Sequence, residues 1–383
     1  MPTAGSRPTR HPRDGSDGAL DLGLTPTSVV IDLSQAVPGV WNADNTANAG
    51  KGIYDASKWA VTFKYTYVKI PAGVTVSFKN HASRAPVVWL VKGDVEVNGN
   101  VNLTGATGAP PGVLALTPTE PGPGGFRGGA SGPQGAGVGM GPGGGGSSQN
   151  GGYVTSYGNP SVLPLIGGSG GGGSWDNGSS AGGAGGSILI GASGTITVNG
   201  GLYAKGGNYY NSGAGSGGAV RLIGSQVLGS GEINCLGGNG WGNGGGAGRI
   251  RIESPVLAAS LRTCPETIAV APATPPLIWA PVETTPTVRV VSVDTFAAPA
   301  DPTAPLVSNA DVAIQNDSPA VVMLETKNFP IEGSVEVRAA QKWGTASWIK
   351  AWYAGGDQAT AQWRATNTFV KGYTTLQARA TAP

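Results

Sequence analysis

One repeated stretch dominates the chain, Gly182–Gly206, in which strand-like alternation is combined with regularly placed glycine. A short apolar run, Ile188–Ile190, precedes a segment whose apolar residues recur at every second position. These residues are Ile196, Val198, Leu202 and Ala204. Because side chains on a strand alternate between its two faces, all four point to one side. Asn199-Gly200 interrupts the alternation, and we expect the chain to turn there through positive φ.

The same spacing occurs twice more, as VEVNGNVNLTG over residues 95–105 and as VLGSGEINCLG over residues 227–237. An apolar strand precedes each copy, and a fourth such strand closes the series. These strands are Val87–Val91, Ile188–Ile190, Val220–Ile223 and Arg249–Ile252. Self-similarity of this kind predicts a β-solenoid, in which each coil buries its apolar face against the next. The repeat turns are expected at Asn98, Gly99, Asn199, Gly200 and Gly231.

Glycine accounts for 67 of the 383 residues, and only 12% of the residues are charged. A glycine in regular structure costs about 0.5–1 kcal/mol relative to alanine. So many glycines are compatible with a net stability of about 5–15 kcal/mol only where the packing requires them. The largest glycine-rich insertion covers residues 106–186, and shorter ones recur at 206–218 and 237–248. A flexible linker is one interpretation. We favour extended, glycine-packed loops or left-handed glycine helices beside the solenoid, because the insertion contains aromatic residues and few charges.

The predicted fold is all-β, since no helix of three turns is visible. Residues 1–27 form an N-terminal arm, 28–254 the solenoid, 255–305 a Pro-rich linker and 306–383 a small immunoglobulin-like β-sandwich. The linker contains two strand candidates, Leu277–Trp279 and Val288–Val293. Strands of the sandwich are expected at Val312–Ile314, Ala320–Thr326, Ser334–Ala339, Ser347–Tyr353, Thr360–Thr366 and Thr374–Ala380.

The sequence offers little for catalysis, so we expect no catalytic residues, no metal and no cofactor. His11 and His81 are the only histidines, and no group of residues has the spacing of metal ligands or of a catalytic triad. Cys235 occupies an inward repeat position as a small buried hydrophobe, and its pairing with Cys264 stays open. The adjacent carboxylates Asp94 and Glu96 are expected on a solvated face.

Charge and hydropathy restrict the partners. A net charge of +2 gives no argument for nucleic acid, and the absence of a long apolar run predicts no membrane insertion. The polar start MPTAGSRPTRHPRDGSDG has no apolar segment, so we expect no secretory signal and synthesis in the cytoplasm.

Aromatic residues are the strongest candidates for contacts with a ligand or with another subunit. Those in the glycine-rich insertions should share one face, where flat rings could stack on sugars or on a neighbouring subunit. The alternative is that they cover the surface of their own glycine loops. On the predicted strand 347–353, two tryptophans share one face. The candidates are Trp175, Tyr209, Tyr210, Trp241, Trp348 and Trp352.

The repeat, [VI]-x-V-N-G-x-[VL]-x-[LA]-x-G after an apolar strand and before a glycine-rich loop, resembles glycine-rich solenoid proteins of tailed-phage particles and of some bacterial surfaces. The segment DGSDGAL near the start also looks like the openings of phage fibre and spike proteins. The resemblance covers residues 14–253. It implies a structural or receptor-contacting role, a homo-oligomer with a trimer as one form, and no shared catalytic residues.

The first hypothesis is therefore a non-enzymatic fibre, spike or decoration subunit on a virion surface, whose partners are itself, other virion proteins and a host cell-surface glycan. A secreted bacterial adhesin or extracellular filament subunit is the second hypothesis. A polysaccharide-degrading β-helix enzyme is the third, and it would need ionisable groups gathered in a groove.

Overall fold

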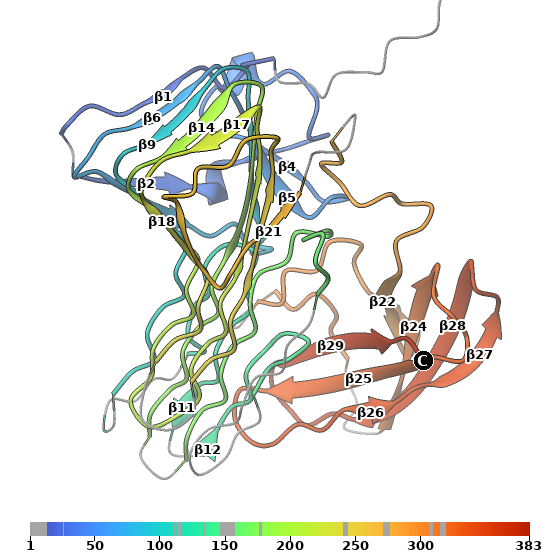
Figure 1. Ribbon diagram of the computed structural model, residues 1–383. Helices are drawn as coiled ribbons and strands as arrows, with labels where there is room; N and C mark the ends of the chain where they lie inside the picture. The colour runs from blue at the N-terminus through green and yellow to red at the C-terminus, as the bar shows by residue number, and fades with distance from the viewer. Residues whose placement is uncertain are drawn as a thin grey trace, which may run out of the picture.

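The protein is all-β, and its only helices among the described residues are two single 3-10 turns, η1 (Leu33–Gln35) and η2 (Thr46–Asn48). Figure 1 shows a set of parallel sheets, a bundle of extended segments that leaves them, and a separate antiparallel unit. The computed structural model describes residues 14–25, 27–110, 112, 117–132, 135–145, 158–175, 178–239, 244–270, 276–305, 309–314 and 319–383.

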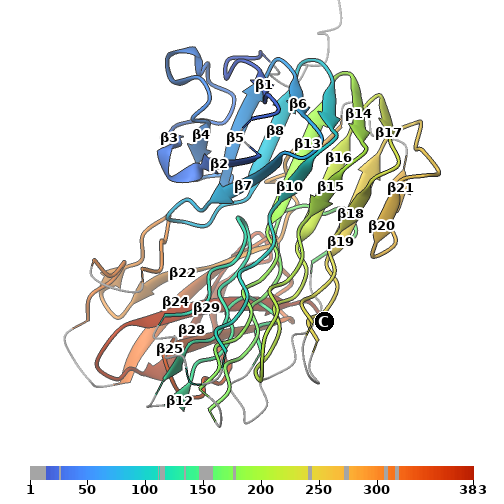
Figure 2. The ribbon, with the colours of Figure 1, turned by 90° about the vertical axis from the view of Figure 1, so that its left-hand side faces the viewer.

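Three sheets built mainly from parallel strands form the first part of the molecule (Figure 2). The first sheet has the order β1 (Leu20–Asp21), β6 (Val68–Ile70), β9 (Val95–Val97), β14 (Thr195–Val198), β17 (Gln226–Leu228). The second has the order β2 (Ser28–Asp32), β7 (Thr75–Lys79), β10 (Asn100–Asn102), β15 (Gly201–Tyr203), β18 (Glu232–Asn234), β20 (Arg262–Cys264). The third has the order β21 (Ile268–Val270), β19 (Arg249–Glu253), β16 (Ala219–Ile223), β13 (Ser187–Ala192), β8 (Val87–Val91), β5 (Ala60–Tyr65), β4 (Ile53–Asp55), β3 (Val37–Pro38).

The chain visits the three sheets in a fixed order. Strands β5, β6 and β7 lie in the third, first and second sheets, and the sets β8–β10, β13–β15 and β16–β18 repeat this path. We call one such passage a round. Each strand pairs in parallel with its counterpart in the next round, apart from the antiparallel pair β4–β5. The three sequence repeats therefore correspond to three successive rounds.

The core lies between the three sheets and is made of rows of stacked side chains. The registers of β5, β8, β13, β16 and β19 align one residue from each round, and every member is essentially inaccessible to solvent. Burying such a side chain contributes about 1.5–3 kcal/mol. The two rows of the third sheet are Val61, Val87, Ile188, Val220, Ile250 and Phe63, Trp89, Ile190, Leu222, Ile252.

The outer face of the third sheet is buried as well, which explains its continuous apolar runs. Leu189 and its neighbours in β8 pack against Val162 and Leu165 from the insertion and against Ile278. Residues 277–279, expected as a strand, are not one. Ile278 is 1% exposed but lies in an irregular segment that covers this face, so its burial rather than strand pairing accounts for the apolar triplet.

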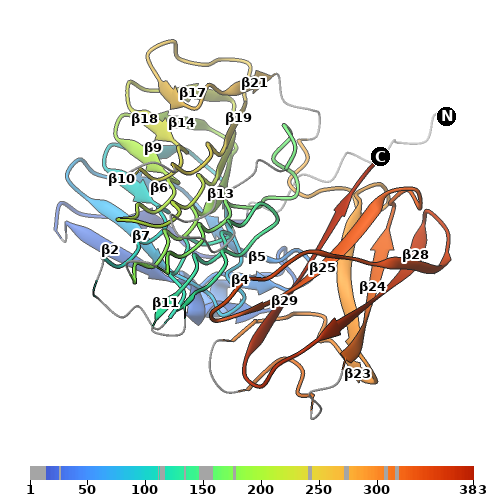
Figure 3. The same cartoon turned by 90° about the horizontal axis from the view of Figure 1, so that it is seen from below.

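The second part of the molecule has two antiparallel sheets that enclose a separate core, seen at the right of Figure 3. One sheet has the order β23 (Phe296–Ala297), β22 (Thr287–Val293), β24 (Pro319–Lys327), β28 (Thr360–Thr368), β27 (Trp352–Gly356). The other has the order β26 (Ile349–Lys350), β25 (Ser334–Gln341), β29 (Thr374–Thr381). A separate hairpin joins β11 (Ser131–Gly132) to β12 (Gly135–Ala136).

Several expected boundaries change. The segment expected as a linker, 255–305, supplies β20 and β21 to the parallel sheets and β22 and β23 to the antiparallel unit, because its strands find pairing partners in both parts of the molecule. The described part of the arm contributes β1, and Asp17 accepts backbone N–H groups of Gly50, Gly52 and Lys64. The first 13 residues lie outside the described part of the chain.

Two of the strands expected in the antiparallel unit also differ from the structure. The segment 347–353 passes from one sheet to the other at Ala351, which is 1% exposed, so it forms β26 and the start of β27 rather than one strand. Residues 312–314 are not a strand. Val312 and Ile314 instead pack from an irregular segment against the core of the unit.

Candidate contact surface

Extended glycine-rich segments leave the parallel sheets and run beside one another (Figures 1 and 2). We call the described segments 103–109, 119–130, 137–145, 166–174, 179–187, 204–218, 235–239 and 244–248 the glycine array. Successive residues of segment 179–187 donate to three different neighbouring segments, and the pattern repeats after three residues. The backbone N–H donors and carbonyl acceptors are Ala181 to Gly129, Gly182 to Gly213, Gly183 to Ala106, Ala184 to Phe126, Gly185 to Ser216, and Gly186 to Leu103, at 2.8–3.1 Å.

A period of three residues without hydrogen bonds inside the segment is the geometry of a polyproline II helix, which is left-handed and extended. Such a segment presents three rows of backbone groups, and in the array each row bonds to another chain segment. Main-chain hydrogen bonding therefore holds segment 179–187 on three sides. This arrangement agrees with the glycine helices expected from the composition and explains how the described part of the insertion is held with few charged residues.

Close approach of backbones, rather than turning, is what requires glycine here. A Cβ placed on Gly182 would lie 2.0 Å from the carbonyl oxygen of Gly207, and one on Gly185 would lie 2.1 Å from that of Ala204. Ordinary contacts of a Cβ begin at about 3.4 Å. Any side chain at these positions would push neighbouring segments apart and break their hydrogen bonds.

The repeat turns follow the same rule, and the expectation of positive φ at Asn199-Gly200 is wrong. Neither Gly99 nor Gly200 has positive φ. A Cβ on Gly200 would instead lie 1.8 Å from the carbonyl oxygen of Gly99, and one on Gly231 would lie 2.1 Å from that of Gly200. The glycine of each turn therefore lies directly against a backbone carbonyl oxygen of the turn in the preceding round. Asn199 Nδ2 also donates to Asn98 Oδ1 at 2.8 Å, which links two turns through side chains.

The candidate aromatic residues of the insertions do not behave alike. Trp175 lies in the turn between two segments of the array and is 62% exposed, and Tyr210 lies in the next turn and is 50% exposed. Tyr209 is buried and covers its own segment, which fits the alternative of a local packing role. Trp241 lies outside the described residues. Two of the four candidates are therefore displayed at turns remote from the strands of the parallel sheets.

The antiparallel unit is fixed to the array by contacts that the sequence did not indicate. Arg338 of β25 donates to the carbonyl oxygen of Gly139 in the array at 2.7 Å. The N–H of Gly344 donates to the carbonyl oxygen of Ala136 in the adjoining hairpin strand β12 at 2.9 Å. The ring of Trp343 lies against Gly132, leaving no room there for a side chain. No periodicity in the chain relates these residues, so only the folded structure brings them together.

Trp348 lies close to this contact and also lines the cavity described below. Two guanidinium groups lie over its ring, with Arg338 Cζ 4.7 Å and Arg379 Cζ 4.2 Å from the ring centroid. Burial, reinforced by the nearby Arg379 charge, lowers the pKa of Arg338 to about 10. Trp352 behaves differently and is 67% exposed on the other sheet. The two tryptophans therefore do not share a face, because the chain changes sheets between them.

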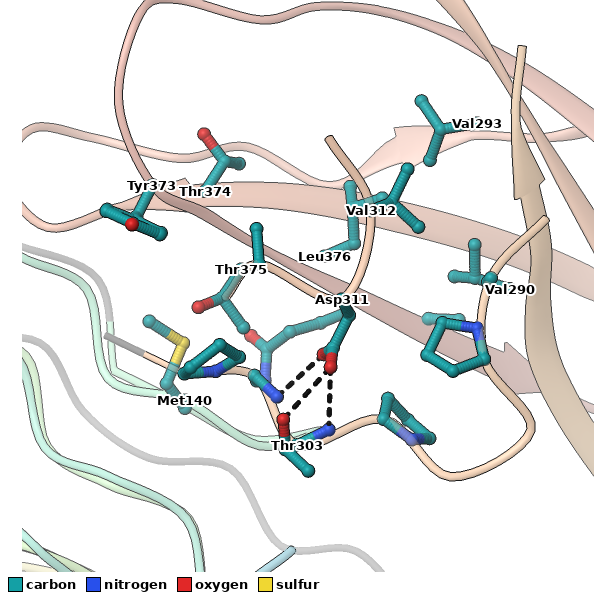
Figure 4. A pocket seen from close by; sticks show the side chains of 18 of the residues that line it. Met140, Val290, Val293, Thr303, Asp311, Val312, Tyr373, Thr374, Thr375 and Leu376 are labelled. Carbon is teal, nitrogen blue, oxygen red and sulfur yellow. Dashed lines mark hydrogen bonds between the residues drawn. The ribbon is translucent and has the colours of Figure 1, made fainter. Parts of the chain in front are cut away.

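A cavity of about 930 Å³ lies where the antiparallel unit meets the array (Figure 4). Val290, Val293 and Leu376 line it from the two sheets, and Met140 lines it from the array. Asp311 Oδ2 accepts a hydrogen bond from the N–H of Ala304 at 2.8 Å, and Asp311 Oδ1 accepts from Thr303. These bonds hold Thr303 and Ala304 next to Asp311 in the wall of the cavity. Most of the exposed lining is apolar, and five charged residues also contribute to it: Arg84, Arg127, Arg289, Asp311 and Lys371.

Within the described residues, no group of three or more His, Cys, Asp or Glu could hold a metal ion. Cys235 and Cys264 are both free thiols. Since Cys264 is in register with Asn234, its side chain points to the opposite side of the sheet from that of Cys235. No helix in the described part of the chain has the length and apolar character needed to cross a membrane.

A scan against protein-family models matches none of them, and searches of curated proteins and of solved structures find no significant relative.

Proposed function

We propose that this protein is a β-solenoid with an immunoglobulin-like β-sandwich that acts as a non-enzymatic structural subunit on the surface of a phage particle, as a fibre, spike or decoration protein. It would assemble with itself or with other virion proteins and contact the host surface. The observation that supports this role best is the three-residue hydrogen-bonding period of the glycine array, which builds a projecting body held mainly by main-chain hydrogen bonds.

The display of aromatic rings gives this body a means of contact. Trp175 and Tyr210 lie at turns of the array and are 62% and 50% exposed. Backbone hydrogen bonds hold the segments that carry them. Large rings on a rigid support lose little conformational entropy on binding. Such a surface suits attachment to a glycan or to another subunit.

Two measurements test the proposal. Mass spectrometry of purified phage particles should detect this chain in a fixed copy number, and antibodies against it should label the particle surface in electron micrographs. Particles carrying Trp175→Ala together with Tyr210→Ala should assemble normally but adsorb to host cells more slowly. Absence of the chain from particles would refute the virion role, and unchanged adsorption would refute the contact role of these two rings.

A secreted adhesin or filament subunit is the second candidate, supported by the ends of the parallel sheets. The strands at one end, β1 and β2, and β20 at the other each pair on one side only within the described chain. Val30 and Val256 near these edges are largely exposed. Unpaired edges are templates for pairing with another chain. Sedimentation of the purified protein over a range of concentrations tests this candidate, which predicts long end-to-end polymers rather than a closed oligomer.

A further inference from the structure

The five-stranded antiparallel sheet has an outer face that is turned away from the glycine array. The Arg338 hydrogen bond to the array comes from β25 of the other sheet, Figure 1 places β27 and β28 on the remote side of the unit, and Figure 3 places β28 there. Trp352 pairs with Arg364, and Arg364 pairs with Met323, so these three residues form one row on this face. Tyr353 lies on the opposite face of the sheet, where it is 46% exposed and its ring is 5.6 Å from that of buried Trp363.

A second row of the same face carries hydrogen-bonding groups that are already positioned. Glu325 Oε1 accepts from Arg289 Nε at 3.0 Å, and Glu325 Oε2 accepts from Gln362 Nε2 at 3.2 Å. Gln362 is two residues from Arg364 along β28, which places the rows about 7 Å apart. That spacing is close to the width of one sugar ring. The row presents acceptor and donor atoms in an arrangement fixed before any ligand arrives.

The edge strand leaves open space at Gly355. Gly355 pairs with Gln362, and a Cβ built on Gly355 would meet nothing within 4 Å. The register shifts between Tyr353 and Gly355, which marks a bulge, and bulges commonly redirect a side chain at the edge of a sheet. Gly355 therefore lies at the end of the row of Gln362 and Glu325, next to the row that contains Trp352 and Arg364, and it adds no side chain that would obstruct a ligand there.

We propose that this face binds a glycan that contains carboxylated sugars, such as hexuronates. The C–H face of a pyranose would stack on Trp352, since the ring face carries negative quadrupole density. Arg364, directly opposite on the neighbouring strand, would pair with the sugar carboxylate through two parallel N–H donors. Gln362 and Glu325 would exchange hydrogen bonds with ring hydroxyls. Charge complementarity at Arg364 is what favours an acidic sugar over a neutral one.

Titration of the purified full-length chain with a defined tetragalacturonate tests the proposal, with indole fluorescence and calorimetry as readouts. The carboxyl-reduced tetramer serves as the neutral counterpart. We expect binding of the acidic tetramer and about tenfold weaker binding by Trp352→Ala. Arg364→Gln should weaken binding of the acidic tetramer by about fivefold to twentyfold and leave the neutral one unchanged.

Tyr67→Ala, which removes an exposed aromatic ring from the parallel sheets, is the matched control and should bind like the wild type. Circular dichroism and the melting temperature establish that each variant is folded. Wild-type affinity in Trp352→Ala, or no binding of either tetramer by the wild type, would overturn the site. Equal affinity of the wild type for both tetramers would overturn the assignment to acidic sugars. Since free protein is measured, these outcomes are independent of whether the chain resides in a phage particle.

Discussion

Replacing a single array glycine by alanine is the sharpest test of how the molecule is held together. In Gly182→Ala the new Cβ would lie 2.0 Å from the carbonyl oxygen of Gly207, at least about 1.4 Å inside ordinary contact. The segment around Gly207 must move, and it carries two hydrogen bonds, one from its own N–H to Gly183 at 2.8 Å and one from the N–H of Gly215 to its carbonyl at 3.1 Å.

The expected cost follows from these contacts. Overpacking of a close-packed interior costs about 1–3 kcal/mol. Weakening the two hydrogen bonds adds about 0.5–1.5 kcal/mol each. Alanine returns about 0.4–1 kcal/mol by restricting the unfolded chain. The net loss is about 3 kcal/mol, which lowers the melting temperature of a unit of this size by about 6–12 °C.

The control is a glycine of the same array that faces open space. A Cβ on Gly246 would meet nothing within 4 Å, so Gly246→Ala should leave the melting temperature unchanged or raise it slightly. Thermal unfolding followed by tryptophan fluorescence and circular dichroism measures both variants on the full chain. Equal melting temperatures for Gly182→Ala and Gly246→Ala would refute the argument that close backbone approach selects glycine in the array.

Three further predictions concern other parts of the molecule. Gly200→Val should lose most of its soluble yield, because its Cβ would lie 1.8 Å from a backbone oxygen of the previous round, whereas Asp94→Asn should express normally since its amide oxygen can still accept a backbone N–H. Yields that match would contradict the turn geometry. Burial lowers the pKa of His81 below its usual 6.5, so the folded state resists protonation. Stability should therefore fall as the pH drops below 6.5, and His81→Phe, which keeps a ring stacked on Tyr54 4.0 Å away, should flatten urea midpoints measured from pH 7.5 to 5. Burial also raises the pKa of Cys235, so a thiol reagent at pH 8 should modify Cys264 alone in the native protein and both thiols in urea; two reactive thiols in the native protein would count against the inward position of Cys235.

The sequence predicted the all-β class and the position of most strands of the parallel sheets, because apolar residues there recur with the two-residue period of a strand. The inward positions of Ile196 and Val198 could be assigned from that period alone, whereas residues 188–190 are apolar on both faces and gave no such assignment. The requirement for glycine at the repeat turns was also predictable. Its reason was not, because the approach of Gly200 to Gly99 depends on a neighbouring round 101 residues earlier in the chain.

The misplaced elements have a common physical cause. Ile278 and Val312 are apolar and lie in short hydrophobic runs, yet each covers a core from an irregular segment instead of joining a sheet. The change of sheet at Ala351 likewise leaves no trace in the alternation of residues 347–353. Local patterns report burial, and long-range pairing decides whether a buried segment becomes a strand. The contacts of Trp348 with Arg338 and Arg379 depend on such pairing, and so does the exposed position of Trp352.

The three-residue hydrogen-bonding repeat of the array sets a rule for insertions and deletions. Opposed segments such as 103–109 and 179–187 stay in register only if both change length together, in multiples of three residues, or about 9 Å of extension per step. A turn that joins two segments is free of that constraint. The segments of the glycine array can thus change length only in steps of three residues. The turns between them can change in sequence without disturbing the array.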